Sequence, residues 1–212
     1  MVKRHQELFT CVLSFHYAIM DGWSAQCLVR FVNQHYLQTL SMRAVEADPD
    51  HSYFTAQKML EAESRKNVQF WERALENIAA TAGLLESLPI KVQNETARPF
   101  ILQDAQLSIQ GDLLHALRET CKQEGLTLHS ILQFAWHRTL YAYCNASQTV
   151  IGTIVSGRNL PIAGIEDSVG LYINTLPLAV DHEADPNMSI RELIGKIQDS
   201  MMDISNHSGI NL

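Results

Sequence analysis

The chain has 212 residues, of which 46% are hydrophobic and 18% charged, and its formal net charge is −7. This composition supplies apolar surface for one core or two small ones and excludes a disordered chain. The acidic balance excludes nucleic acid as a partner, because phosphate backbones require a clustered basic face. No window reaches the roughly 18 uncharged apolar residues of a membrane span, and the four cysteines indicate small buried hydrophobes in a reducing cytoplasm.

The first half of the chain predicts one buried strand followed by two helices. Residues 7–20 form a nearly continuous run of aromatic and β-branched residues, typical of a central strand. Asp21-Gly22-Trp23-Ser24 breaks this run, and Ser24 is the expected N-cap of a helix. That helix runs to about Leu40, with an inner stripe of Leu28, Phe31, Val32, Tyr36 and Leu40. A second amphipathic helix is expected over roughly 53–79, with Val68, Phe70, Trp71, Leu75 and Ile78 on its inner face.

Prolines at 89 and 99 place a lobe boundary or linker in residues 80–100, and the second half then predicts three strands and three helices. The strands are expected over 101–109, 148–155 and 171–179. The helices are expected from Asp112 to Gly125, from Thr127 to about Cys144, and from a capping box at Ser189–Glu192. Strands that alternate with helix pairs indicate an α/β fold with a mixed sheet.

The residues that could carry chemistry gather where the first apolar run ends. On a strand, His16 and Tyr17 would point to opposite faces, so only one of them can face a cleft on a given side. Asp21 would lie at the edge of the core and would need a cationic partner there. Taken alone, His16 is more typical of a satisfied core histidine, and Asp-Gly is an ordinary turn signal. The histidines show no His-x-x-x-His pair joined to carboxylates, so no metal site is predicted.

Three segments carry a resemblance to a known family. HYAIMDGWS resembles the His-His-x-x-x-Asp-Gly-Trp-Ser signature of the condensation domains of nonribosomal peptide synthetases, with Tyr17 at the second histidine. IGTIVSGRNLPIAGIEDSVGLYINTLPLAV resembles the later Val-Gly-x-x-x-Asn-Thr-Leu-Pro strand of the same family, and FWERAL resembles its Trp-bearing segment. A wider superfamily of CoA- and carrier-dependent acyltransferases shares the first motif, whereas the second motif is more specific.

The resemblance implies a chloramphenicol acetyltransferase-like α/β fold, with a mixed β-sheet flanked by helices, in an incomplete two-lobed domain. Residues 1–90 would form the C-terminal part of the N-lobe with the active-site motif, and residues 91–212 a partial C-lobe. Such a middle piece should expose strand edges, so an oligomer that covers them is expected.

The resemblance also implies a reaction and its partners. In the family, an acceptor amine attacks a donor thioester and an amide bond forms. Both substrates are carried on the phosphopantetheine arms of peptidyl and aminoacyl carrier proteins, beside adenylation domains. No cofactor or metal bound directly by the chain is implied, and neither nucleic acid nor a membrane is an expected partner.

Each family residue is carried over to its matching position. His16 matches the first, mainly structural histidine, and Tyr17 stands where the second histidine handles the amine proton. Asp21 matches the aspartate that pairs with an arginine, here Arg158, and Gly22 matches the glycine whose backbone approaches the reacting centre. Trp23, Ser156 and Asn174 are expected along the substrate channel.

Tyr17 is the departure from the family pattern. A phenol is a poor proton acceptor at neutral pH, although it can still donate a hydrogen bond. Three interpretations therefore stay open: an inactive copy, slow condensation through positioning alone, and a non-catalytic recruitment module. A stand-alone CoA- or carrier-dependent acyltransferase is the alternative enzyme, and the stretch from Ser156 to Asn174 argues against it.

Overall fold

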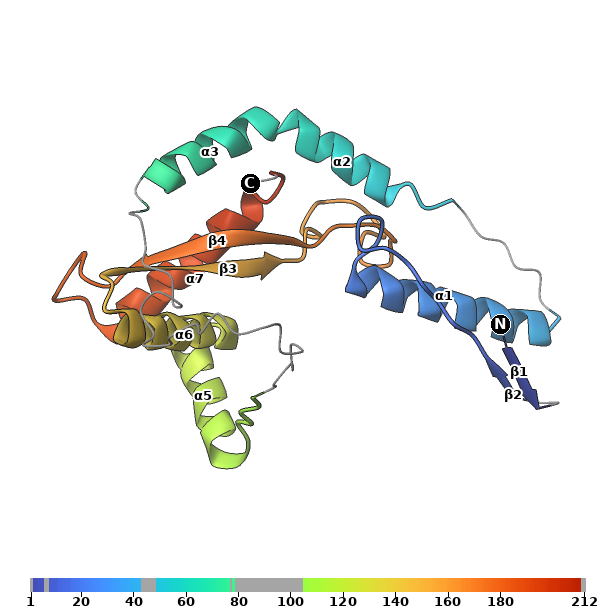
Figure 1. The fold of residues 1–212 in the computed structure, drawn as a ribbon, viewed down its shortest axis with the longest axis horizontal. Coiled ribbons are helices and arrows are strands. Elements are labelled where there is room, and N and C mark those ends of the chain that lie inside the picture. The colour runs from blue at the N-terminus through green and yellow to red at the C-terminus, as the bar shows by residue number, and fades with distance from the viewer. Residues whose placement is uncertain (1, 6–7, 43–48, 77, 79–104, 211–212) are drawn as a thin grey trace, which may run out of the picture. The chain divides into compact units, whose positions relative to one another are not determined.

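The computed structural model describes residues 2–5, 8–42, 49–76, 78 and 105–210 (Figure 1). Its elements are β1 (Val2–His5), β2 (Leu8–Thr10), α1 (Gly22–Leu40), α2 (Ser52–Ala62), α3 (Ser64–Glu76), α5 (Gly111–Glu124), α6 (Leu128–Cys144), β3 (Gln148–Val155), β4 (Asn174–Asp181) and α7 (Ile190–Asn206). The predicted linker over 80–100 lies outside the described residues. None of the described helices is long and apolar enough to cross a membrane.

The chain divides into two compact units, each assembled from segments that are distant in sequence. Unit 1 comprises Met1–Val68, Ile154–Thr175 and Ser208–Leu212, and unit 2 comprises Gln69–Thr153 and Leu176–His207. Each unit therefore draws on both of the predicted lobes. The assignment of residues 1–90 and 91–212 to an N-lobe and a C-lobe stays a prediction.

The strand predicted over residues 7–20 is wrong. Only Leu8–Thr10 is extended there, and it pairs antiparallel with β1 in the register Val2 to Thr10. Residues 11–20 form no strand, and Tyr17 and Ile19 are 69% and 67% exposed. An apolar run becomes a buried strand only when a sheet pairs with it, and no described strand pairs with residues 11–20.

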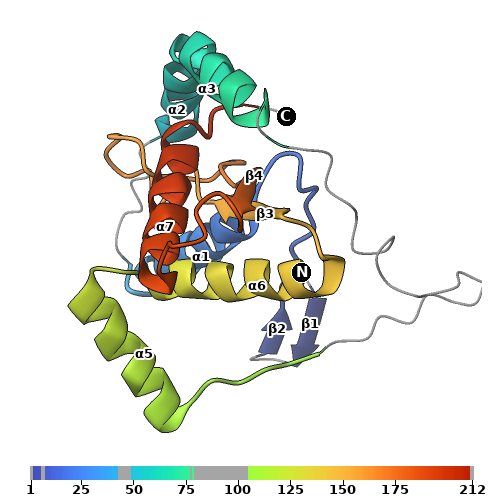
Figure 2. The ribbon, with the colours of Figure 1, turned by 90° about the vertical axis from the view of Figure 1, so that its left-hand side faces the viewer.

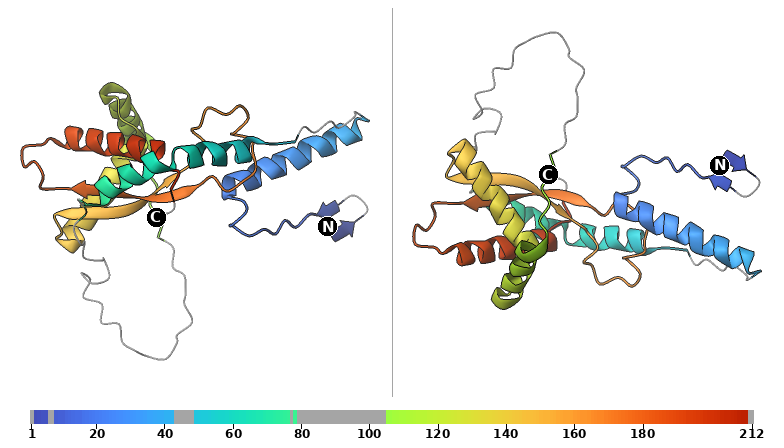
Figure 3. Two further views of the ribbon diagram at one scale, coloured as in Figure 1. Left: turned by 90° about the horizontal axis from the view of Figure 1, so that it is seen from above. Right: turned by 90° about the horizontal axis from the view of Figure 1, so that it is seen from below.

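Helix α1 starts earlier than predicted, and its N-cap is Asp21 instead of Ser24. The Asp21 carboxylate accepts the Ser24 backbone N–H at 2.7 Å, the hydrogen bond that defines a capping aspartate. The buried face of α1 is short, because only Ser24 and Cys27 are fully buried. The predicted inner stripe is exposed at Phe31, Val32, Tyr36 and Leu40. Figure 3 shows α1 as one long, unbroken helix.

The single helix predicted over 53–79 is two helices. α2 ends at Ala62, Glu63 has non-helical dihedral angles, and α3 begins at Ser64. Of the predicted inner residues, Trp71 is buried at 2% exposure, and its indole N–H donates to the carbonyl of His207 at 2.9 Å. Val68 and Leu75 are each 42% exposed, so the predicted inner face is only partly correct.

Unit 2 follows its local sequence signals closely. Gly125 ends α5 in the left-handed conformation, with φ 67°, and Thr127 forms a capping box at the start of α6. Ser189 and Glu192 form the predicted capping box of α7. These helix boundaries are confirmed, whereas the strand predicted over 101–109 is not: its described part has no regular structure, and Leu107 is 87% exposed.

The core of unit 2 lies between β4 and the inner face of α7. β3 has its predicted bounds, and β4 begins and ends slightly later than predicted. The expected mixed sheet is represented among the described residues by two two-stranded sheets, β1–β2 and β3–β4. Figure 2 shows α6 and α7 beside the second sheet. The buried apolar side chains of this unit include Leu176, Leu178, Val180, Ile194 and Ile197, whereas the predicted inward residue Ile190 is 66% exposed.

Of the four cysteines, which were expected to be buried, only Cys27 is fully so. Cys11 is exposed, and Cys121 and Cys144 are half-buried.

Candidate functional site

Asp21 is the centre of a buried polar network in unit 1. Its Oδ1 accepts the Ser24 backbone N–H, and its Oδ2 accepts the backbone N–H groups of Tyr172 at 3.0 Å and Ile173 at 3.2 Å. Burial alone would raise the pKa of Asp21, but these hydrogen bonds outweigh burial and hold the pKa below its usual value. The carboxylate is therefore ionised at neutral pH and needs the nearby cation, Arg158, whose Nη2 lies 3.5 Å from Oδ1.

Arg158 is 7% exposed and reaches across the loop that links β3 to β4. Its Nη1 donates to the carbonyl oxygens of Ile165 at 2.6 Å and Ser168 at 3.0 Å. Its Nη2 donates to the Ser24 hydroxyl at 2.9 Å, and its guanidinium carbon lies 4.0 Å from the centre of the Tyr172 ring. One buried cation thus fixes the β3–β4 loop to the start of α1.

Ser24 completes this network with its hydroxyl. The hydroxyl donates to the carbonyl of Gly170 at 2.6 Å and accepts the Gly170 N–H at 3.0 Å as well as the Arg158 guanidinium. A side chain at position 170 would meet the ring of Tyr53 at 2.3 Å, so this close approach requires glycine. The Ser24 hydroxyl is therefore saturated and has a structural role here.

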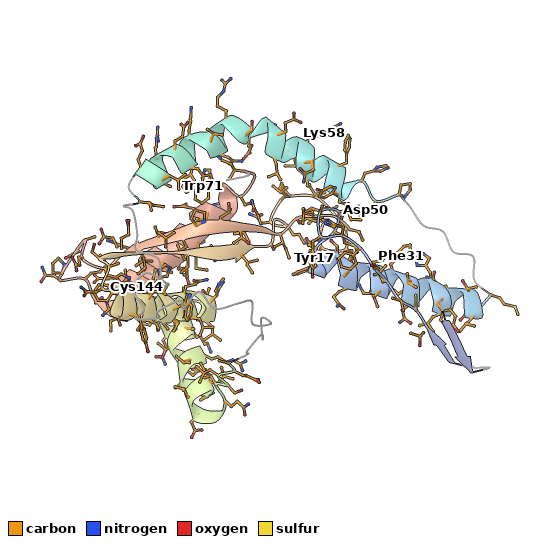
Figure 4. The ribbon with its side chains drawn as sticks, in the orientation of Figure 1. Tyr17, Phe31, Asp50, Lys58, Trp71 and Cys144 are labelled. Atoms are coloured by element: carbon orange, nitrogen blue, oxygen red, sulfur yellow. The ribbon has the colours of Figure 1, made fainter. Side chains whose placement is uncertain are left out.

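The turn before α1 carries His16 and Tyr17, and it lies outside this buried network. His16 Nδ1 accepts the backbone N–H of Ala18 at 3.0 Å. Tyr17, labelled in Figure 4, is 69% exposed, and its ring lies 5.7 Å from that of Phe15. A side chain at Gly22 would meet no protein atom within 4 Å. The approach of its backbone to the reacting centre stays a prediction.

The three predicted channel residues lie in two places. Trp23 is 48% exposed, and its indole N–H donates to the carbonyl of Glu166 at 2.9 Å. The Ser156 hydroxyl accepts the Arg158 backbone N–H at 3.3 Å, which places Ser156 on the same loop. Asn174 instead donates to the carbonyls of Ser208 at 3.1 Å and Ile210 at 2.7 Å. Only Asn174 lines the cavity of about 550 Å³ in unit 1, together with Tyr53, Glu61, Gly157, Tyr172 and Gly209 among others.

Comparison with known proteins identifies the family. Residues 1–212 match the family model described as the condensation domain. The chain is 36% identical over 225 residues to the N-(5-amino-5-carboxypentanoyl)-L-cysteinyl-D-valine synthase of Amycolatopsis lactamdurans, and 39% identical over 219 residues to that of Penicillium chrysogenum. Each match covers 100% of this chain and 6% of the relative. The chain belongs to the condensation-domain family.

Solved structures agree on the fold of this condensation domain. It is similar to the first condensation domain of the calcium-dependent antibiotic synthetase, at 17% identity and a TM-score of 0.68 over 92% of this chain and 42% of that one. It is also similar to the X-domain from teicoplanin biosynthesis, solved in complex with OxyB, at 22% identity and a TM-score of 0.65 over 93% and 44%. The fold is the chloramphenicol acetyltransferase-like α/β fold of condensation domains, of which this chain spans less than half.

Asp50, two residues before α2, is a further residue of the hydrogen-bond network in this condensation domain that its motifs did not indicate. Its Oδ2 accepts the Ser168 hydroxyl at 2.6 Å and the Val169 N–H at 3.2 Å, and its Oδ1 accepts the Ser52 N–H at 2.9 Å. An aspartate side chain commonly accepts the N–H two residues further along in an Asx-turn, so the residue type could have marked the bond to Ser52. Nothing local in the sequence indicates the bonds to residues more than a hundred positions away.

Unit 2 of the condensation domain holds a second buried polar group that the sequence did not reveal. The Thr149 hydroxyl lies 2.7 Å from His137 Nδ1 and 2.9 Å from His182 Nε2. Burial, and then the nearby His182, lower the pKa of His137 from 6.5 to about 4. Burial and the charge of Arg138 lower the pKa of His182. Both rings are therefore neutral at pH 7, and no third metal-ligating side chain joins them in the described part of the chain.

Proposed function

We propose that this chain supplies the motif-bearing part of an amide-forming condensation domain in a nonribosomal peptide synthetase. A donor thioester and an acceptor amine would arrive on the phosphopantetheine arms of peptidyl and aminoacyl carrier proteins, with adenylation domains in the same cytoplasmic assembly. The amine nitrogen attacks the thioester carbonyl, the C–N bond forms, the C–S bond breaks, and the amine proton leaves for the released thiolate. Tethering would supply much of the rate, because it makes the encounter effectively unimolecular.

We further propose that Tyr17 impairs this reaction, and the turn at residues 16–18 is the observation that carries the proposal. A general base contributes roughly 10²–10⁴ in rate, and a phenol is a poor one at neutral pH. The neighbouring His16 does not replace it: its Nδ1 accepts the Ala18 N–H, so the neutral ring carries its proton on Nε2 and has no free lone pair. Condensation would then rest on positioning alone.

A recruitment module is the second candidate function. The exposure of Tyr17 and Trp23, at 69% and 48%, favours it, because aromatic side chains are enriched at protein interfaces. The X-domain that shares the fold was itself solved as a complex with a second protein, OxyB. This hypothesis predicts binding of a partner protein with no turnover at all.

The decisive experiment uses a hybrid domain in which residues 1–212 replace the aligned segment of the Amycolatopsis lactamdurans synthase. Single-turnover reactions with two loaded carrier proteins are followed by mass spectrometry of the carrier-bound product. The hybrid with Tyr17 should form product slowly, and Tyr17→His should accelerate it by on the order of 10²-fold, the low end for a positioned base. The isolated chain should show no turnover with either residue.

Each alternative has its own outcome. Equal and rapid turnover by both hybrids would show that position 17 handles no proton. Carrier binding without product in both hybrids would favour the recruitment module, and transfer from acyl-CoA to a free amine would favour the stand-alone acyltransferase.

A further inference from the structure

Asp50 forms a second anchor for the β3–β4 loop, on which Arg158 depends. The carboxylate accepts hydrogen bonds from the Ser168 side chain and the Val169 backbone, near the middle of the loop. Burial raises its pKa, but the hydrogen bonds from Ser168, Ser52 and Val169 outweigh burial and lower it. Asp50 is therefore a charged acceptor at neutral pH, and charged hydrogen bonds are stronger than neutral ones.

A relay leads from Asp50 to the guanidinium. The Ser168 hydroxyl uses its only proton on Asp50, so it is free to accept the Tyr172 hydroxyl, which lies 2.7 Å away. That bond fixes the Tyr172 ring, which also meets the Tyr53 ring edge-on at 5.1 Å, lies 4.0 Å from the Arg158 guanidinium, and packs in a buried cluster with Ala56 and Ile165. Asp50, acting through the Ser168 hydroxyl, thus fixes the position of the Tyr172 ring against the Arg158 guanidinium.

The loop is held at three successive points by charged side chains from different segments. Asp50 accepts a hydrogen bond from the backbone N–H of Val169. Arg158 donates to the carbonyl oxygens of Ile165 and Ser168. Asp21 accepts from the backbone N–H groups of residues 172 and 173. Asp50 and Asp21 never touch each other in this arrangement. Both carboxylates accept hydrogen bonds from the short backbone stretch 169–173, so a shift of the backbone at Asp50 also moves the N–H groups that donate to Asp21.

We propose that Asp50 is a positioning residue, which through Ser168 and Tyr172 fixes Arg158 and with it the Asp21–Ser24 turn that follows Tyr17. Asp50 is labelled in Figure 4 at the start of α2. What this turn does in catalysis rests on the proposed function, whereas the coupling between the two anchors does not.

Hydrogen exchange on the full chain tests the coupling without any activity. Asp50→Asn keeps the shape of the side chain and removes its charge, and Ser168→Ala removes only the relay hydroxyl. In both variants the amides of Tyr172 and Ile173, whose acceptor is Asp21, should exchange at least about tenfold faster, while those of Leu176 and Leu178 in β4 stay unchanged. The matched control is Asp167→Asn, which changes an exposed carboxylate on the same loop and should leave all four amides unaffected.

A purely local role for Asp50 gives a different pattern. In that case Asp50→Asn would accelerate exchange at Ser52 and Val169 only, and Ser168→Ala would leave Tyr172 and Ile173 protected; this result would overturn the proposal. If Asp50→Asn unfolds the chain, Ser168→Ala alone still decides, because it leaves Asp50 in place.

A kinetic split provides a second readout in the hybrid domain carrying Tyr17→His. Asp50→Asn should lower kcat about tenfold or more with KM changed less than about twofold, because a misplaced turn harms the transition state more than carrier binding. An unchanged kcat beside faster exchange at Tyr172 would retain the coupling and reject its link to the reaction. If the hybrid is inactive throughout, the exchange data still judge the coupling separately from the proposed function.

Discussion

At the scale of single residues, Asp21 has the strongest structural role in the site. It caps α1, accepts two further backbone N–H groups and faces a cation that is 7% exposed. Asp21→Ala strands Arg158 without its counter-charge, so we expect the free energy of unfolding to fall by about 3–5 kcal/mol. Urea unfolding of the purified chain measures this loss.

The matched control for this prediction is the exposed pair of Arg30 and Asp167. Their side chains are 56% and 76% exposed, so solvent screens their attraction. Asp167→Ala should cost less than about 1 kcal/mol. Comparable losses in both variants would contradict the special role of the buried network.

His137 gives the chain a pH dependence of known sign. Its pKa is about 4 in the folded chain and has the ordinary value of 6.5 in the unfolded chain. Between these two pH values, His137 is therefore protonated in the unfolded chain and neutral in the folded chain. Stability is therefore complete above pH 6.5 and declines as the pH falls toward 4, by about 3 kcal/mol in total. Urea midpoints measured at successive pH values should show this slope.

Two variants identify the source of the slope. His137→Gln should flatten the decline between pH 6.5 and 4, whereas His51→Gln, at an exposed position, should retain it. His182 also has a lowered pKa and shares Thr149, so a small residual slope belongs to that ring. An unchanged slope in His137→Gln would show that another group is titrating.

At the scale of elements, the end of β3 depends on Gly157. This residue has φ +65°, and a Cβ there would lie 2.1 Å from the carbonyl oxygen of Tyr172, a backbone atom that cannot swing away. Gly157→Ala should therefore cost about 3 kcal/mol, from overpacking and a left-handed backbone together. Thermal unfolding checks this value.

Gly195 is the opposite case and the natural control. It lies inside α7, and a Cβ there would meet nothing within 4 Å. Gly195→Ala should stabilise the chain by about 0.5–1 kcal/mol through helix propensity. If both alanine variants shift stability in the same direction, close packing at Gly157 is not the cause.

The elements that sequence predicted well are those whose signals are local. Gly125, Thr127 and Ser189 mark helix ends through bonds within three or four residues, and the structure places the boundaries there. Residues 11–20 and 105–109 were predicted to be extended and form no strand, because a strand needs a partner strand, which periodicity does not reveal.

In the candidate site, too, contacts between residues close in sequence could be predicted and contacts between distant residues could not. Ser24 suited a helix N-cap by its residue type, but its hydroxyl bonds Gly170 and Arg158, so Asp21 caps the helix instead. Arg158 was matched to Asp21 through two family motifs and not through any local pattern. Asp50 stayed hidden because its partners on the loop lie 118 and 119 positions away.

At the scale of the whole molecule, the chain exposes a large amount of apolar surface. On one side of α1, helical spacing brings together five apolar residues that are between 53% and 63% exposed: Val29, Val32, Tyr36, Leu37 and Leu40. Scattered apolar residues are ordinary, but a continuous stripe along one helix marks a surface that associates with another. Val32, Tyr36 and Leu40 in this stripe were predicted to face inward, and each is more than half exposed.

We therefore expect the chain to self-associate through α1. Sedimentation velocity should show a concentration-dependent increase in mass, because burying large side chains from two copies removes apolar area from water. Val32→Lys with Tyr36→Lys places two charges one helical turn apart on the stripe and should weaken association by on the order of tenfold or more. The control, Gln34→Lys with Gln38→Lys, adds the same charge to the same helix at exposed polar positions and should change association much less. A sample that stays monomeric at every concentration, or a control that weakens association equally, would show that the stripe on α1 is not the contact.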